Sequence, residues 1–310
     1  MSGFFWVGLT VLSSNFFNFI KYNKTEMKKK EKIALVVEGG GFKSVFSAGV
    51  LDAFLINKFN PFDIYIGVSS GAMSLSYYIT SQYKTYFSLS KEVSVNEKFL
   101  SYKNALAEQG YMDLKFLTKY AKQNNPLELQ KLKESTDNKQ FYIVGTNLEN
   151  GEAVYLEPNK QNIYKCLRAT SSLPFFTKAK CKIDGVDLMD GAWSDPIPVK
   201  SAADFGANKI IVIRPHPFGY KVNGLSYLGL IAGYWWRNTP KVRDIFFKEN
   251  SNYNQAVDFL TKKNKTIEIL QICPNKFLKS GVVGTTKEDL MQDYHCGLEK
   301  GMDFLNTNFL

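Results

Sequence analysis

Residues 36–50 read VVEGGGFKSVFSAGV and place three consecutive glycines between a run of β-branched residues and a segment with helical spacing. Glycine weakens both kinds of element because it loses more backbone freedom on folding than any other residue. Residues 33–37 are short and apolar, which predicts a buried strand, and the apolar positions within 44–57 recur at helical spacing. Three bare peptide units between a strand and a helix indicate a loop whose backbone approaches another group closely.

The rest of the chain repeats this alternation of short β-rich runs and helical segments. The dipeptide Asp184-Gly185 favours a tight turn and predicts a hairpin. Strands separated by helices imply a mostly parallel sheet covered on both faces, so the predicted fold class is α/β in a single domain. We predict strands at 63–68, 140–147, 209–214 and 266–273, hairpin strands within 149–156 and 181–190, and helices at 69–83, 196–205 and 286–304, with further helices outside the sheet between 84 and 140.

The composition disfavours several classes of protein and of site. The chain has 310 residues, of which 45% are hydrophobic and 22% charged, and a formal net charge of +10 that favours anionic surfaces such as phospholipid headgroups. No arginine-rich tract or familiar nucleic-acid motif occurs, so nucleic acid is not an expected partner. The four cysteines form no CxxC pair and the two histidines lie far apart. We therefore expect no metal, no cofactor and a cytoplasmic location. Peripheral association with the inner face of the membrane is compatible with that location.

The first 26 residues differ from the rest of the chain. Residues 1–20 are apolar, but they lack a basic segment before the apolar run and a clear cleavage site, which argues against a secretory signal. A lysine-rich run at 21–32 follows, so an interfacial helix or marginal membrane anchor is an alternative to an extended start before Met27. We predict that 1–26 form a poorly packed or interfacial extension of a domain at 27–310.

The sharpest chemical signal is the G-x-S-x-G sequence Gly67-Val68-Ser69-Ser70-Gly71 at a predicted strand-to-helix junction. A serine on a tight turn needs small neighbours so that the backbone can bend sharply and expose the hydroxyl. The helix that follows places its positive dipole end near the charge that develops during nucleophilic attack. Ser69 is the candidate nucleophile because it is centred between the glycines; the alternative is a plain loop packed against a helix.

A nucleophilic serine needs a base, and the chain offers two kinds. His216 or His295 would complete a Ser-His-Asp triad. Asp190 ends the second strand of the predicted hairpin and precedes Gly191-Ala192, where the backbone can approach closely. Partial burial raises the pKa of an aspartate, so that its carboxylate can accept the serine proton directly. We favour Asp190 as the base and keep the histidine triad as the alternative.

Four segments in order resemble the patatin-like phospholipases, specifically their bacterial single-domain branch. They are EGGGFKSVFSAGVLDAFL, IGVSSGA, RATSSLPFF and DGAWSDPIPV, and the resemblance covers most of residues 32–215 but is weaker over 216–310. It implies a three-layer α/β/α sandwich and hydrolysis of lipid acyl esters by a Ser–Asp dyad without histidine. The resemblance makes Ser69 the nucleophile and Asp190 the base, with oxyanion-hole amides from Gly39, Gly40 and Gly41 and support from Lys43, Gly67, Gly71, Gly191 and Ala192.

The chain departs from the pattern of that family at one position. The family's glycine motif closes with a glycine where this chain has Ser44, which we expect to cap the following helix. This departure implies altered loop geometry rather than lost activity. Lys43 places a cation in the first turn of a helix, against the dipole, so we expect it to stabilise the loop or an anionic substrate.

The function predicted from these observations is a serine acyl hydrolase of the lipase or phospholipase type that cleaves carboxylic esters of lipids. The substrate is expected to be a lipid ester, with phospholipid at an anionic membrane surface as one form of it. A catalytically silent lipid-binding scaffold is an alternative. A nucleotide site at the glycines is disfavoured because Ser44 replaces the last glycine that such a loop needs. The apolar stretch 224–238 is either a lid or a core helix.

Overall fold

The computed structural model describes residues 31–309 except 105–109, 174–175, 178–179, 224–229, 232, 235, 263 and 265. The extension predicted at 1–26 lies outside the described residues, and so does much of the stretch 224–238. Residues Lys32–Leu310 form one compact unit.

A single eight-stranded sheet runs through this unit, in the order β5-β6-β3-β2-β1-β7-β8, with β4 also paired to β3. The five strands from β3 to β8 in this order are parallel, and the three that follow β3 in sequence pair antiparallel. The parallel strands are β1 (Ile33–Val37), β2 (Ile64–Val68), β3 (Gln140–Asn147), β7 (Lys209–Ile213) and β8 (Glu268–Ile272), and the antiparallel ones are β4 (Ala153–Leu156), β5 (Cys181–Ile183) and β6 (Val186–Asp190).

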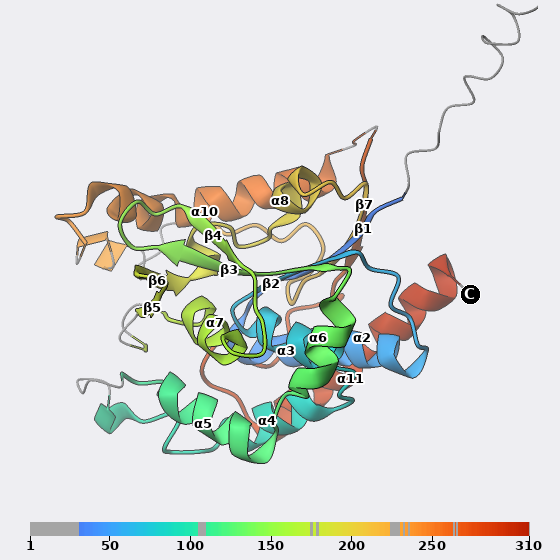
Figure 1. Ribbon diagram of the computed structural model, residues 1–310, viewed down its shortest axis with the longest axis horizontal. Helices are drawn as coiled ribbons and strands as arrows, with labels where there is room; N and C mark the ends of the chain where they lie inside the picture. The colour runs from blue at the N-terminus through green and yellow to red at the C-terminus, as the bar shows by residue number, and fades with distance from the viewer. Residues whose placement is uncertain are drawn as a thin grey trace, which may run out of the picture. The chain divides into compact units, whose positions relative to one another are not determined.

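Helices cover both faces of the sheet (Figure 1). Alternate residues of β1 enter different cores: Leu35 and Val37 pack with the larger helical layer, whereas Ala34 and Val36 pack with the smaller one. The larger layer contains α2 (Ser44–Ile56), α3 (Ser70–Ile79), α4 (Thr85–Val93), α5 (Leu114–Asn124), α6 (Leu129–Thr136), α7 (Ile163–Thr170) and α11 (Lys287–Asn308), and the smaller one contains α8 (Val199–Asp204) and α10 (Pro240–Thr261). The predicted α/β/α class with a mostly parallel sheet is confirmed.

Two helices were not predicted from the sequence. The first, α7, has a clear apolar face but only eight residues, and the second, α10, has 22 residues but few buried apolar ones. One signal was present, because Pro240 occupies the first turn of α10, where its missing N–H costs nothing. The predicted helix at 196–205 is shorter than expected, since it begins only after Pro198. None of the described helices is both long and apolar enough to cross a bilayer.

Candidate active site

Ser69 lies on the sharp turn between β2 and α3 that its sequence predicts. Its backbone has φ 53° and ψ −131°, a combination that a residue with a side chain rarely adopts. The flanking glycines are required by packing: a Cβ at Gly71 would lie 2.5 Å from the carbonyl oxygen of Glu38, and one at Gly67 would lie 2.5 Å from Cα of Ala72. The strained turn therefore holds the Ser69 hydroxyl at the carboxyl end of the parallel sheet.

Asp190 ends β6 and contacts Ser69 directly. The Ser69 hydroxyl donates to Asp190 Oδ2 at 2.7 Å, and the amide of Ala192 donates to Oδ1 at 2.9 Å. Gly191 lets the chain turn here, because a Cβ would meet the carbonyl oxygen of Val144 at 2.3 Å. Asp190 is 1% exposed, and burial raises its pKa to about 7 against the lowering effect of these two hydrogen bonds. Such a carboxylate can accept a proton near neutral pH.

Strand β3 explains why two residues 121 positions apart meet. Val68 at the end of β2 pairs with Val144, and Asp190 at the end of β6 pairs with the next residue of β3, Gly145. The register of two strands on a third therefore brings the residue after Val68, which is Ser69, next to Asp190.

Two threonines that the sequence did not single out hold this arrangement. The amide of Ser69 donates to the hydroxyl of Thr170 at 2.8 Å, and that hydroxyl donates to the carbonyl of Val144. The hydroxyl of Thr146 donates to the carbonyl of Asp190 at 2.8 Å. All these groups are buried, so each hydrogen bond also avoids the cost of an unsatisfied polar atom.

The glycine loop lies beside Ser69, and its three amides differ. A Cβ at Gly39 would lie 3.0 Å from Cβ of Ser69, so the loop backbone passes close to the serine. The Gly40 amide donates to Ser70 Oγ at 3.1 Å. Within the described part of the chain, the amides of Gly39 and Gly41 have no acceptor. One of the three predicted donors, the Gly40 amide, is thus bound within the protein.

Ser44 does not cap α2 as expected. It is the first residue of that helix and is buried, and no side-chain cap is formed at this end. Its hydroxyl instead lies 2.7 Å from Ser70 Oγ, which also accepts the Gly40 amide. The reason is that Ser44 faces the start of α3, where the two helices pack together. The residue that departs from the glycine pattern therefore ties the glycine loop to the nucleophile turn.

Lys43 points to a buried polar cluster behind the glycine loop. Its ammonium lies 3.3 Å from His216 Nε2, and His216 Nδ1 lies 3.0 Å from Glu38 Oε1. Burial lowers the pKa of Lys43, while Glu38 and Asp293 act in the opposite direction. Lys43 thus contacts the loop's supporting cluster, which fits the first of the two roles expected for it.

The centre of that cluster is an ion pair that sequence reasoning missed. Arg214 is fully buried, and its Nε donates to Glu38 Oε2 at 3.0 Å. Tyr253 donates to Glu38 Oε1 at 2.9 Å and accepts from Arg214 Nη2 at 2.9 Å. Burial acts to raise the pKa of Glu38, but His216, Arg214 and Tyr253 outweigh it and hold the pKa below its ordinary value. The sequence does contain a signal for this pair, because Glu38 directly follows the apolar strand β1 and Arg214 directly follows its neighbour β7.

The structure places neither histidine with the proposed nucleophile. Both ring nitrogens of His216 face the cluster just described, and its ring stacks on Tyr220. His295 lies on α11 beside Tyr294. Among the described residues, no hydrogen bond joins either histidine to Ser69 or Asp190.

Replacing the histidines tests the triad directly. For His295→Ala and for His216→Asn, we expect kcat/KM on a short p-nitrophenyl ester to fall by less than about tenfold, because Asp190 already contacts the serine. Loss of a triad histidine would lower kcat by about 10⁶-fold. A loss of that size in either variant, with an unchanged melting temperature, would restore the triad.

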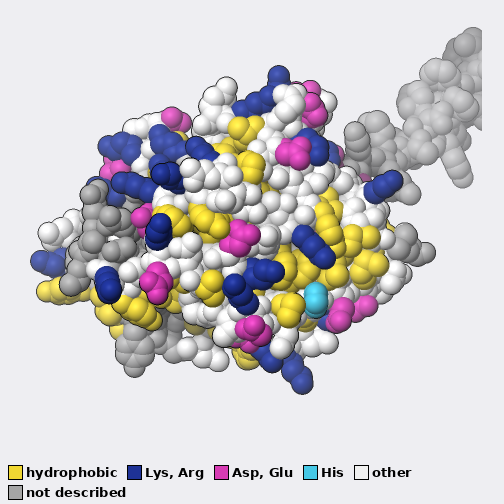
Figure 2. All heavy atoms as spheres, turned by 90° about the horizontal axis from the view of Figure 1, so that it is seen from below, with side chains coloured by type: hydrophobic (Ala, Val, Ile, Leu, Met, Phe, Trp, Pro, Cys, Tyr) yellow, Lys and Arg dark blue, Asp and Glu magenta, His cyan; other side chains and the backbone are white. Residues whose placement is uncertain are grey.

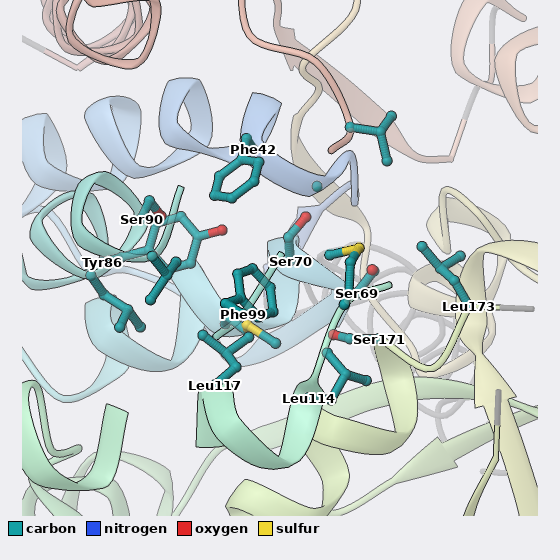
Figure 3. A pocket seen from close by; sticks show the side chains of 16 residues that line it. Phe42, Ser69, Ser70, Tyr86, Ser90, Phe99, Leu114, Leu117, Ser171 and Leu173 are labelled. Atoms are coloured by element: carbon teal, nitrogen blue, oxygen red, sulfur yellow. The ribbon is translucent and has the colours of Figure 1, made fainter. Parts of the chain in front are cut away.

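An apolar pocket opens from Ser69 between α3, α4 and α5. Figure 3 shows Ser69 and Leu173 at one end, Tyr86 and Ser90 at the other, and Phe99 between them. Most of its lining is apolar, so it suits an aliphatic group next to the serine hydroxyl. The other apolar residues that line it are Phe42, Met73, Leu89, Val93, Met112, Leu114, Leu117 and Val282.

Two family models, a sequence relative and a solved structure are similar to this chain. The family model "Patatin-like phospholipase" matches residues 35–203, and a domain of unknown function, DUF6363, matches residues 239–309. The uncharacterized protein YjjU of Escherichia coli (strain K12) is 30% identical over 277 residues, which cover 89% of this chain and 78% of YjjU. The crystal structure of VipD from Legionella pneumophila is similar with a TM-score of 0.45 and 12% identity, over 90% of this chain and 67% of VipD.

Proposed function

Because the chain belongs to the patatin-like phospholipase family, we propose that it is a serine acyl hydrolase that cleaves carboxylic esters of lipids through a Ser69–Asp190 dyad. The observation that carries this proposal is the 2.7 Å hydrogen bond from the Ser69 hydroxyl to Asp190 Oδ2 at the mouth of an apolar pocket. A hydroxyl aimed at a buried carboxylate of raised pKa is a nucleophile with its base already in place.

The reaction begins when Ser69 Oγ attacks the ester carbonyl carbon and its proton passes to Asp190 Oδ2. The tetrahedral intermediate collapses, the bond to the alcohol breaks, and the alcohol leaves with the proton from Asp190. Water then attacks the acyl-enzyme, again giving its proton to Asp190, and the carboxylic acid leaves as Ser69 recovers its hydroxyl. One carboxylate serves as base and acid in both halves.

The negative charge on the carbonyl oxygen needs donors that are in place before the reaction. The amides of Gly39 and Gly41 support this role because they have no acceptor among the described residues. The Gly39 backbone passes beside Ser69, and Gly41 lines the same pocket as Ser69. The N-terminus of α3, a helix of ten residues, adds a positive partial charge directly after Ser69. The Gly40 amide donates to Ser70 and contributes to catalysis by holding the glycine loop in position. Each preorganised donor is worth roughly 3–4 kcal/mol of transition-state stabilisation.

The location of the reaction is proposed from charge and substrate. A formal net charge of +10 favours contact with anionic headgroups, and lipid esters reside in membranes. In Figure 2, which views the molecule from the side of α4 and α5, lysine and arginine side chains are spread among hydrophobic ones. We place the enzyme in the cytoplasm, in peripheral contact with the inner face of the membrane.

Labelling with a fluorophosphonate tests the nucleophile. The reagent is expected to modify wild-type protein once, on the tryptic peptide that contains Ser69, and to leave Ser69→Ala unlabelled, because only an activated serine displaces fluoride. Mass spectrometry locates the adduct. Full labelling of Ser69→Ala would place the nucleophile elsewhere, and an unlabelled wild type would favour a silent lipid-binding scaffold.

A further inference from the structure

A second apolar cavity continues the pocket that contains Ser69. The two cavities share four lining residues, which form a partition between them: Met73, Leu89, Leu114 and Leu117. Beyond the partition the lining is again mostly apolar and includes Tyr77, Ala121 and Leu127. We name the cavity with Ser69 the proximal chamber and the one behind it the distal chamber.

Two helices show that the chambers lie in series. On α3, which begins directly after Ser69, the proximal chamber is lined by Ser70 and Met73, and the distal chamber by Met73 and Tyr77. On α5, Leu114 and Leu117 line both chambers, whereas Ala121 lines only the distal chamber. On both helices, the residues that line only the distal chamber lie nearer the C-terminus. The distal chamber is therefore farther from Ser69 than the proximal one.

The distal chamber offers few free polar groups to a ligand. Tyr77 donates its hydroxyl to the carbonyl of Asn125 at 2.8 Å, and the hydroxyl of Tyr164 accepts the amide of Leu127 at 2.9 Å. The hydroxyl of Thr118 donates to the carbonyl of Leu114. These groups are satisfied within the protein, and the other polar side chain in the lining is the half-buried Arg168. A polar ligand would therefore lose hydrogen bonds to water on entry and could replace them only at Arg168. An unbranched aliphatic chain would lose none.

We propose that the distal chamber is a binding site for the end of a long acyl chain and that Met73 controls its use. This inference rests on the proposed function, because it places the ester carbonyl at Ser69. Met73 is half-buried and borders both chambers. An unbranched side chain with three rotatable bonds can withdraw or fill the passage at little cost. Met73 is thus a specificity-determining residue for chain length.

The spacing of residues on α3 sets the scale of the selection. At a rise of 1.5 Å per residue, Met73 lies about 6 Å and Tyr77 about 12 Å from Ser69 along the helix. An extended aliphatic chain advances roughly 1.3 Å per carbon, given carbon–carbon bonds of about 1.5 Å. The proximal chamber therefore matches about five carbons of a chain, and the distal chamber roughly five more.

Two substitutions with opposite effects test the proposal. Met73→Ala truncates one of the four partition residues and is expected to raise kcat/KM about tenfold for p-nitrophenyl esters of 12 carbons relative to those of four. Ala121→Phe fills the distal chamber and is expected to lower the same ratio at least tenfold. Val257→Ala is the matched control, since Val257 is buried in the opposite helical layer and lines neither chamber. It should keep the wild-type ratio.

A binding measurement separates this inference from the proposed reaction. Calorimetric titration of Ser69→Ala with fatty acids of six to 16 carbons should show affinity rising with length, and Ala121→Phe in that background should remove the gain beyond about six carbons. If hydrolysis occurs but neither substitution changes the length dependence in either assay, the distal chamber is not a binding site. If no ester is hydrolysed but the titrations shift as described, the chamber stands and the reaction is wrong.

Discussion

Asp190→Asn is expected to lower kcat/KM for ester hydrolysis by about 10³-fold, within the range for loss of a general base. The substitution keeps the shape of the side chain, and its Oδ1 can still accept the Ala192 amide. What it removes is the group that takes the Ser69 proton, because a neutral amide is not a base near pH 7. Steady-state kinetics on a short p-nitrophenyl ester measure the effect, and circular dichroism confirms the fold.

The pH dependence of wild type follows from the same carboxylate. Asp190 must be ionised to act as a base and burial raises its pKa to about 7, so kcat/KM should rise with pH up to about 7 and level off above it. Activity that stayed constant between pH 5 and 8 would contradict a base with this pKa.

Stability should move in the opposite direction to activity at Asp190. Its pKa is higher in the folded protein than in the unfolded chain, so the folded state holds this proton more tightly, and stability is lost as the pH rises through about 7. Asn carries no charge at any of these pH values. Asp190→Asn should therefore melt at a higher temperature than wild type at pH 8, with a smaller difference at pH 5. A lower melting temperature at pH 8 would show that the carboxylate is structural.

The second large effect is expected at Glu38. Glu38→Ala should lower the free energy of unfolding by about 3–5 kcal/mol, because it leaves the Arg214 guanidinium buried without its counter-ion. Arg214 is 0% exposed and has its salt bridge to Glu38 at 3.0 Å. Urea unfolding measures the loss.

A surface pair provides the control for Glu38. Glu268 forms a salt bridge with Lys209 at 3.3 Å, but its side chain is 54% exposed. Glu268→Ala should therefore cost less than about 1 kcal/mol. Equal losses in the two variants at pH 7 would show that the buried pair stabilises the fold no more than the surface pair does.

The pKa of Glu38 lies below its ordinary value. The contribution of Glu38 to the free energy of unfolding is therefore present above pH 4.5 and is lost as the pH falls through the folded pKa.

Local features of the site were predictable from the sequence. Strands β1 and β3 have the bounds predicted from the sequence, and the serine turn has the geometry that its flanking glycines indicate. Each of these features depends on a few consecutive residues, since side-chain alternation and backbone sterics act over that distance. The helix α10 was missed because its buried apolar residues are too few to mark one face, so its local sequence gives no helical pattern.

The contacts around the site could not be predicted in this way. The capping role expected of Ser44 was wrong because its hydroxyl faces Ser70, a residue of another helix. The Gly40 amide, expected to face a substrate, is bound by the same Ser70. Thr170 looks like any threonine near the end of a helix until the fold brings it to the amide of Ser69.

The sequence by itself determined the α/β class, the strained serine turn, the bare glycine loop and the aspartate that ends a hairpin strand. Tertiary structure alone decided that Ser69 meets Asp190 across 121 residues and that Glu38 meets Arg214 across 176. The physical reason is that backbone conformation is set by neighbours in sequence, whereas these pairs depend on strand register. Val68 and Asp190 take adjacent positions on β3, and β1 and β7 end side by side, so that each pair forms only when the whole sheet has formed.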